Sequence, residues 1–326
     1  MAMTRFAALG AACLVFLGIG VTNASATSAY PTRPLDLIVR FGTGGGADVM
    51  AREFAAVLHE QHPHIVVRVF DLPGANSLRA VNHIMGLPAD GYSLLEVDAT
   101  IPLLQVEKKT SYTSRDFDEI CQVDSDAIVY AARPDDKRFP NAKAMIAYAS
   151  QHPVSIATTA NGSSAELATW YASHLLGLKA RDIGYGHPGE RITTILGGHV
   201  DLIAENWGAL ASLFKSGKLR PLLVLSPTPI GGYSNVPISR EVGLNFTWGQ
   251  VRGFAVKHGT PAAIEARLRH LCQGAADAPA FKAFLAQHGE GGFEGYLDKT
   301  AFLAVMIHQE ALFEQVLKAL AASPGH

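Results

Sequence analysis

The stretch "LIVRFGTGGGADVMAR" at residues 37–52 joins an apolar run to a helical pattern through four glycines within five positions. Glycine loses more backbone freedom on folding than any other residue, so such a cluster predicts a turn with unusual dihedral angles or a ligand close to the backbone. A glycine-rich turn between a strand and a helix also gathers unpaired N–H groups at the positive end of the helix dipole. The stretch therefore predicts an anion site at a strand-to-helix turn.

Two kinds of ligand fit this turn. A dinucleotide fits through the spacing G-x-G-x-x-A followed by an acidic residue after the next strand, at Gly42, Gly44, Ala47 and Asp71. A small carboxylate fits if the amides of residues 43–47 hold it beside the helix end, with Asp48 capping the helix. A turn without a ligand is the third interpretation, which a second glycine-containing loop at the same predicted sheet edge, residues 71–76, disfavours.

The size and charge of the chain limit its class. It has 326 residues, of which 48% are hydrophobic, and this length is enough for about two domains with cores of their own. The formal net charge is −2, 17% of residues are charged, and the basic residues are scattered. We therefore expect no nucleic-acid partner.

The N-terminus carries a pattern typical of a secretory signal peptide. Arg5 precedes an apolar run at residues 6–21, and Ala24 and Ala26 have the spacing of a cleavage signal. The apolar run is shorter than the roughly 20 residues that cross a bilayer, so a retained membrane anchor is the weaker alternative. We expect residues 1–26 to be removed and the mature chain to lie in the periplasm.

Two cysteines remain in the mature chain, Cys121 and Cys272, in a compartment that permits disulfides. One bridge between them is possible. Two separate buried thiols are an equal alternative, because separation along the sequence does not report the distance between two Cα atoms.

Strand-like and helix-like segments alternate along the mature chain. They form βαβ patterns at residues 35–98 and resume at residues 119–226, where Asn141 is predicted to cap a helix. A last strand at residues 251–257 precedes a tail that reads as all helical. The pattern predicts an α/β protein with two domains, and we expect the helical tail to pack on the first of them.

Motifs for catalysis and for metal binding are missing from the sequence. It contains no G-x-S-x-G, no H-E-x-x-H, no P-loop lysine and no C-x-x-C. His62 and His64 bracket a proline, which favours a solvated loop over a metal site. Ser163 and Ser164 lack a base, since Glu166 fits better as a first-turn acid of a helix. We therefore expect no metal and no cofactor, and an exported enzyme is the weaker alternative.

Several motifs together resemble one known family. The sequence resembles the tripartite tricarboxylate transporter receptors, also called the Bug family of periplasmic solute-binding proteins, through "YPTRPLDLIVRFGTGGGADVMAR", "DLPGANSL", "PADGYSLL", "ILGGHVDLIAEN", "SGKLRPLLVLS", "NVPISREVGL" and "GTPAAIEARL". The resemblance implies a two-lobed type II periplasmic-binding-protein fold, or Venus flytrap, in which each lobe is a mostly parallel sheet flanked by helices. It also implies a first lobe of residues 30–128 plus 254–326 and a second lobe of residues 129–253.

The function implied by this resemblance is capture of a small organic acid between the lobes and its delivery to membrane transporter subunits by a monomeric receptor. A sensory receptor of the same fold that signals to a two-component system is the alternative. By the family pattern, the ligand-binding residues are Phe41, Thr43, Gly44, Gly45, Ala47, Asp48, Ala75, Asn76, Asp98, Thr100, Asn161, Ser163, Ser164 and Asn206.

The sequence also departs from the family pattern near these residues. Arg40 stands where a proline is usual, and Glu166 replaces a common histidine. Gly186 replaces a lysine, while Glu96 and Asp98 add negative charge on the third strand. These changes weaken the expectation of a strongly anionic ligand and leave open whether the acid is a mono-, di- or tricarboxylate, an aromatic acid or an amino acid.

Overall fold

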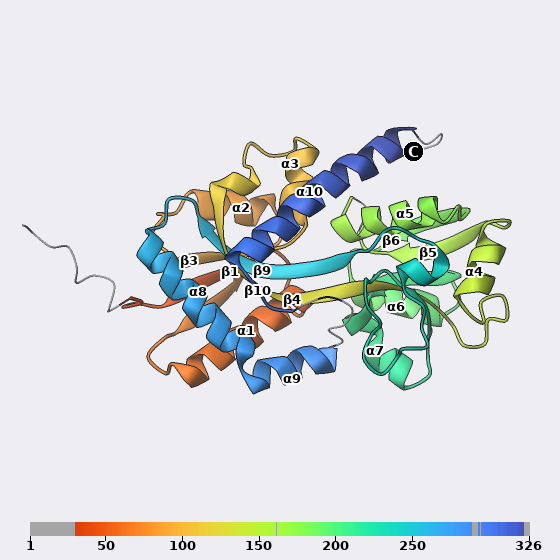
Figure 1. The fold of residues 1–326 in the computed structure, drawn as a ribbon, viewed down its shortest axis with the longest axis horizontal. Helices are drawn as coiled ribbons and strands as arrows, with labels where there is room; N and C mark the ends of the chain where they lie inside the picture. Colours follow the sequence, from red (N-terminus) through yellow and green to blue (C-terminus); the bar gives the residue numbers. More distant parts are fainter. Residues whose placement is uncertain (1–29, 161, 289–292, 294, 323–326) are drawn as a thin grey trace, which may run out of the picture.

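The computed structural model describes residues 30–160, 162–288, 293 and 295–322, and it shows an α/β fold with two lobes (Figure 1). The signal peptide predicted at residues 1–26 lies outside the described residues. Within the described part of the chain, no helix is both long enough and apolar enough to cross a membrane.

The first lobe starts with βα units, as the alternating pattern predicts. These elements are β1 (Leu35–Val39), α1 (Gly46–Gln61), β2 (Val67–Asp71), α2 (Leu78–Met85), β3 (Ser93–Val97) and α3 (Thr100–Val106). The long strand β4 (Phe117–Ala132) follows and continues into the second lobe. The chain returns through β9 (Gly249–Lys257) and ends with α8 (Ala262–Asp277), α9 (Pro279–His288), β10 (Leu297–Asp298) and α10 (Lys299–Ala322).

The second lobe repeats the alternation between the two long strands. Its elements are α4 (Ala142–Ala149), β5 (Val154–Thr158), α5 (Ser164–Leu175), β6 (Ala180–Gly184), α6 (Pro188–Leu196), β7 (Leu202–Asn206), α7 (Trp207–Lys215) and β8 (Arg220–Val224). Asn141 caps α4 as predicted, because its side-chain oxygen accepts a hydrogen bond from the Ala144 N–H at 2.9 Å.

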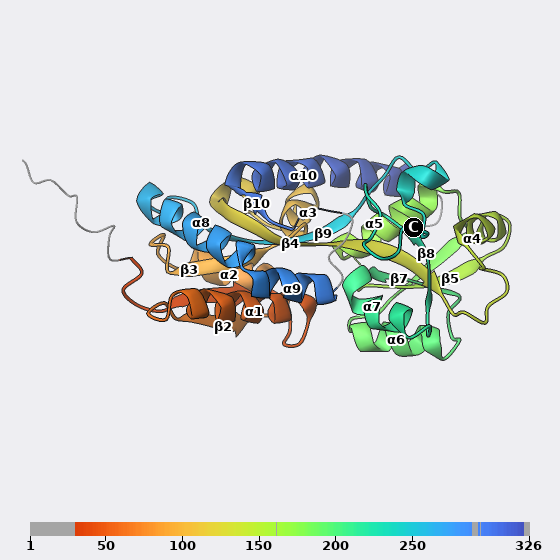
Figure 2. The ribbon, with the colours of Figure 1, turned by 60° about the horizontal axis from the view of Figure 1, so that its bottom comes forward.

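The strands form a mixed sheet in the order β2-β1-β3-β9-β4-β7-β5-β6. Strands β1, β2 and β3 are parallel, whereas β9 runs antiparallel to both β3 and β4. Strand β4 pairs with β9 up to Ala127 and with β7 from Ile128 onward. These two antiparallel strands therefore connect the lobes, and Figure 2 shows them running from one to the other.

A disulfide fixes the helical tail to the first lobe. Cys121 on β4 and Cys272 on α8 form this bridge, with their Cα atoms 6.6 Å apart. Helix α8 packs against α1, in a core that includes Phe54 and Phe281. The bridge settles the alternative that the sequence left open.

Helix α10 corrects one expectation about the tail. The tail is expected on the first lobe, and α10 packs there but also reaches the second lobe, so that it lies across both (Figure 2). Phe302 and Met306 pack with first-lobe side chains, whereas Phe313 and Val316 join the core of the second lobe around Trp248. A helix of 24 residues is about 36 Å long, which is enough to bridge two lobes.

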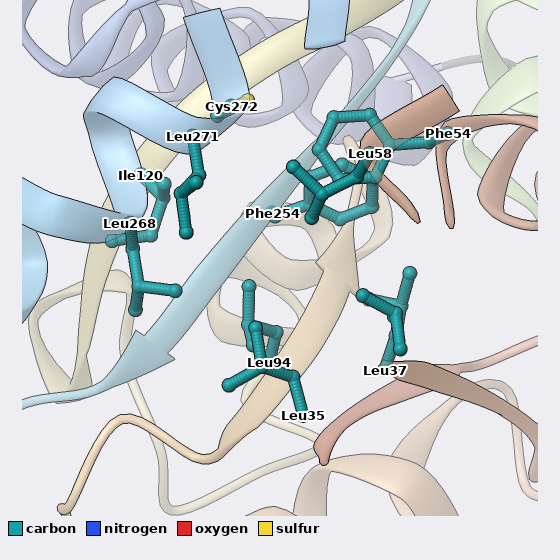
Figure 3. Close-up of a pocket in the computed structure, with 11 residues that line it drawn as sticks. Leu35, Leu37, Phe54, Leu58, Leu94, Ile120, Phe254, Leu268, Leu271 and Cys272 are labelled. Atoms are coloured by element: carbon teal, nitrogen blue, oxygen red, sulfur yellow. The ribbon is translucent and has the colours of Figure 1, made fainter. Parts of the chain in front are cut away.

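The core of the first lobe contains a small cavity of about 20 Å³ (Figure 3). Its lining is apolar and comes from the sheet, α1 and α8, with Phe54, Phe254 and Leu271 among the side chains. A cavity of this size has room for about one water molecule and offers no polar partner to an anion. A ligand carboxylate must therefore bind elsewhere.

Candidate functional site

The loop after β1 turns through its glycines before α1 begins. Gly44 has a φ of 79°, which side chains rarely adopt, whereas Gly45 is the helix N-cap with a φ of −74°. The prediction that Asp48 caps α1 is wrong. Asp48 lies in the first helical turn, and its carboxylate accepts a hydrogen bond from the Gly44 N–H at 2.8 Å. Because this acid lies at the helix start, an anionic ligand is favoured beside the helix and not on its axis.

Two side chains join this loop to the loop after β2. The Thr43 hydroxyl donates to Asp71 Oδ2 at 2.6 Å, and Arg52 Nη2 donates to the same oxygen at 3.1 Å. Since β1 and β2 are parallel neighbours, their carboxyl ends lie at one edge of the sheet, where ligands of open α/β sheets bind. Asp71, considered above as a ribose ligand, is therefore engaged within the protein.

The loop after β2 has a strained backbone. Ala75, Asn76 and Ser77 have φ values of 49°, 47° and 75°, which are uncommon for residues with a side chain. Such outliers cost of order 1–3 kcal/mol each and persist where the surrounding structure enforces them, often at ligand sites. Ala75 and Asn76, two of the predicted ligand residues, thus lie in a strained loop at the same edge as Thr43.

A buried arginine links three strand ends beneath these loops. Arg40 Nη2 lies 2.7 Å from Asp98 Oδ1 and 3.3 Å from Glu96 Oε2. Arg40 also donates to the Glu96 carbonyl at 2.6 Å and, through Nη1, to the Ser77 hydroxyl at 3.0 Å. Burial raises the pKa of Glu96, and the nearby Arg40 opposes this shift. Arg40 therefore holds the second loop to the third strand and offsets one of the two negative charges there.

Asp98 and Thr100 belong to this buried network. Asp98 Oδ1 accepts from the Thr100 N–H at 2.7 Å, and Oδ2 accepts from Gln250 Nε2 at 2.8 Å. Both carboxylate oxygens are thus bonded within the protein. The structure brings these predicted residues close to the loops, where they support the backbone.

The second lobe presents a helix start of its own. Ser163 caps α5, accepting from the Glu166 N–H at 3.2 Å, and its hydroxyl lies 2.6 Å from the Thr159 hydroxyl. Glu166 Oε2 accepts from the Gly162 N–H at 3.2 Å, as a first-turn acid would. Ser164 is buried in the first turn. The predicted Asn161 lies outside the described residues.

Asn206 ends β7 and precedes α7, at the side of the second lobe where β4 enters. Its side-chain oxygen is buried and has no hydrogen-bond partner within the described ranges of the chain. Buried polar atoms are nearly always paired, so this oxygen has capacity for a ligand or for water.

Sequence reasoning missed a carboxyl group in the second lobe. Asp182 on β6 has both oxygens buried without a hydrogen-bond partner among the residues that the structure describes. Burial, and next the charge of Glu166, raise the pKa of Asp182 to about 7. The sequence gives little sign that Asp182 is buried, because a single acidic residue in a five-residue strand usually predicts a solvent-exposed side chain.

Sequence reasoning also missed the charged face of the two connecting strands. Arg252 on β9 forms an ion pair with Asp124 on β4, and Asp126 accepts from the Gly208 N–H at the start of α7 at 3.1 Å. Burial raises the pKa of Asp126 well above its usual value. The signal that could have found them is the presence of charges at alternate positions in strands that are otherwise apolar.

Other candidate sites have little support. The rings of His62 and His64 lie 6.1 Å apart, and no cluster of three metal-ligating side chains occurs in the described ranges. A hollow of about 490 Å³ lies between α10 and the segments that flank Ser226 and Phe246. No predicted ligand residue lines it.

Residues 50–317 match the family described as "Tripartite tricarboxylate transporter family receptor". The chain is 30% identical over 297 residues to the protein BugT of Bordetella pertussis, covering 88% of this chain and 89% of BugT. A solved structure of a TctC solute-binding protein from Polaromonas is 26% identical, with a TM-score of 0.76 over 89% of this chain and 99% of that one. R. palustris Rpa4515, solved with adipate, is 22% identical, with a TM-score of 0.77 over 89% and 97% of the two chains.

Proposed function

This chain belongs to the tripartite tricarboxylate transporter receptor family, whose members are periplasmic solute-binding receptors and not enzymes, and from that premise we propose its own role. It captures a small organic acid between its lobes and delivers the acid to a tripartite membrane transporter, acting as a monomer. The observation that carries the proposal is the 2.6 Å hydrogen bond from Thr43 to Asp71, which joins two backbone loops at one sheet edge. Adipate in Rpa4515, a protein of the same fold, supports an organic acid as the ligand class.

In this proposal the loops after β1 and β2 bind the acid through backbone N–H groups. The second lobe closes on it with Ser163, Ser164, Asn161 and Asn206, and ligand binding favours the closed form. Asp98 and Thr100 act from below by fixing the loops, since their hydrogen bonds remain within the protein. The lobes divide at residues 128/129 and 253/254, and residues 1–26 are removed on export.

A thermal-shift screen of the mature protein tests this role. We expect one acid among adipate, malate, citrate, benzoate and glutamate to raise the melting temperature without being consumed. A ligand at a hundredfold excess over its Kd adds about 2.7 kcal/mol to the free energy of unfolding. The corresponding amides serve as controls at the same concentration.

Two results would contradict the role. If no acid shifts the melting temperature, the chain is not a carboxylate receptor. If the stabilising acid is consumed during a long incubation, the chain is an enzyme.

A further inference from the structure

Arg252 differs from the other buried arginines in how little of its hydrogen-bonding capacity is used. Arg40 and Arg191 each bond through several nitrogens, to carboxylates and to backbone carbonyls. Arg252 is 11% exposed, and its one hydrogen bond to a described residue runs from Nη1 to Asp124. A guanidinium group carries five N–H donors, so Nε and Nη2 keep theirs.

The unused side of this guanidinium faces the glycine loop. A Cβ atom at Gly46 would lie 3.2 Å from Arg252 Nη2. Because glycine has no side chain, the guanidinium group can lie directly beside Gly46, the first residue of α1. The start of a helix is itself positive. Two positive groups this close are stabilised by an anion that contacts both of them.

The acids around Arg252 do not occupy its remaining N–H donors. Asp124 is its ion-pair partner, and Asp126 and Glu96 lie close enough to act on it electrostatically. Asp126 bonds to the Gly208 N–H and Glu96 lies beside Arg40, so each has another partner. Asp124 holds Nη1 and thereby orients the remaining N–H groups of the planar guanidinium.

We propose that Arg252 is a specificity-determining residue, which donates directly from Nε and Nη2 to a carboxylate oxygen of the acid held by the β1–α1 loop. The inference rests on the proposed function and deepens it. A guanidinium bonds more strongly to an ionised carboxylate than to a neutral carbonyl, so the site selects acids over their amides and esters. Asp124 is the positioning residue, because it acts on the ligand only through Arg252.

The test is a double variant that removes both charges of the pair. In Arg252→Gln/Asp124→Asn, the two amides keep a hydrogen bond available, and position 124 carries no carboxylate that has lost its ion-pair partner. Isothermal titration would compare this variant with the wild type for adipate, malate, citrate, benzoate and glutamate and for the corresponding amides. Charge-assisted hydrogen bonds are strong enough that we expect the Kd for the bound acid to rise about 10- to 100-fold. The preference for acid over amide should shrink by a similar factor.

A matched control removes an ion pair elsewhere in the same sheet. Arg68 on β2 and Asp36 on β1 form a bidentate pair at the surface, at 2.7 and 2.9 Å. The variant Arg68→Gln/Asp36→Asn changes the same number of charges of each sign, and we expect it to bind the acid as the wild type does. Circular dichroism of all three proteins reports whether they are equally folded.

The outcomes separate the two proposals. An unchanged Kd and an unchanged acid-to-amide ratio in Arg252→Gln/Asp124→Asn would overturn the inference and leave the receptor role intact. An equal loss of affinity in the surface control would also overturn it, because the effect would then be one of overall charge. A wild type that binds none of the acids would overturn the receptor role and this inference with it.

Discussion

The two lobes share a local motif and differ in the charges that surround it. In the first lobe, Asp48 accepts a hydrogen bond from the N–H of Gly44, four residues before it. In the second lobe, Glu166 accepts from the N–H of Gly162, also four residues before it. Each helix start is thus partly occupied by the protein's own carboxylate.

Different charged side chains lie near the two helix starts. In the first lobe Arg52 lies 2.6 Å from Asp48, and Arg252 lies against the start of α1. In the second lobe, burial is the largest cause of the raised pKa of Asp182, and the negative charge of Glu166 is the second cause. Two arginines thus add positive charge near the first helix start, and a second acid adds negative charge near the other. Under the proposed function, we therefore expect the carboxylate of the ligand in the first lobe.

The largest expected effect on stability comes from removing a buried positive charge from the first lobe. Arg40→Met removes the cation between Glu96 and Asp98 and leaves two buried carboxyl groups without it. Removing one partner of a buried ion pair typically costs about 3–5 kcal/mol. We expect a loss of this size in the free energy of unfolding, measured by urea denaturation at pH 8.

The control for this variant is Arg68→Met in the same lobe. Arg68 is 50% exposed, and exposed ion pairs contribute about 0–1 kcal/mol. If Arg40→Met costs no more than this control, the buried network does not depend on its cation, and the contrast between the lobes loses its physical basis.

A smaller effect is expected from removing an acid in the second lobe. The pKa of Asp182 is raised to about 7 in the folded protein, whereas an unfolded aspartate titrates near 4. Between pH 4 and pH 7, the carboxyl group of Asp182 is protonated in the folded state and ionised in the unfolded state. Its contribution to the free energy of unfolding is therefore fully present below pH 4 and is lost as the pH rises through 7. Asp182→Asn removes this loss, and we expect it to stabilise the protein by about 1–2 kcal/mol at pH 8.

Urea denaturation of wild type and Asp182→Asn at pH 4 and pH 8 measures this difference. The advantage of the variant should appear only at the higher pH. An equal difference in the free energy of unfolding at pH 4 and pH 8 would show that Asp182 titrates normally. The second lobe would then not disfavour an anion more than the first lobe does.

The sequence predicted most of the secondary structure because its signals are local. The cap at Asn141 and the extended stretch at residues 119–134, which the structure shows as β4 at Phe117–Ala132, follow from side chains close together in the chain. The short helix α3 was not predicted, since its seven residues are too few for a clear helical period. Asp48 has the right residue type for a cap, but the turn at Gly44 displaces it into the first turn.

The site was only partly predictable, because its charges pair across long separations. The loops and the start of α5 follow from glycine and serine patterns in short stretches. The ion pairs of Arg40 with Asp98 and of Arg252 with Asp124 join residues 58 and 128 positions apart, as the numbering gives. A single sequence does not report which acids meet which arginines, so Glu96 and Asp98 looked like uncompensated charges when Arg40 in fact lies between them.

A crystal structure of the protein with its stabilising acid tests the central claim most directly. The account predicts one carboxylate of the ligand at the β1–α1 loop, with an oxygen about 3 Å from an amide of residues 43–47 and from Nε or Nη2 of Arg252. A carboxylate bound at the start of α5 instead, on residues 162–166 with Arg252 bonded only to Asp124, would contradict it.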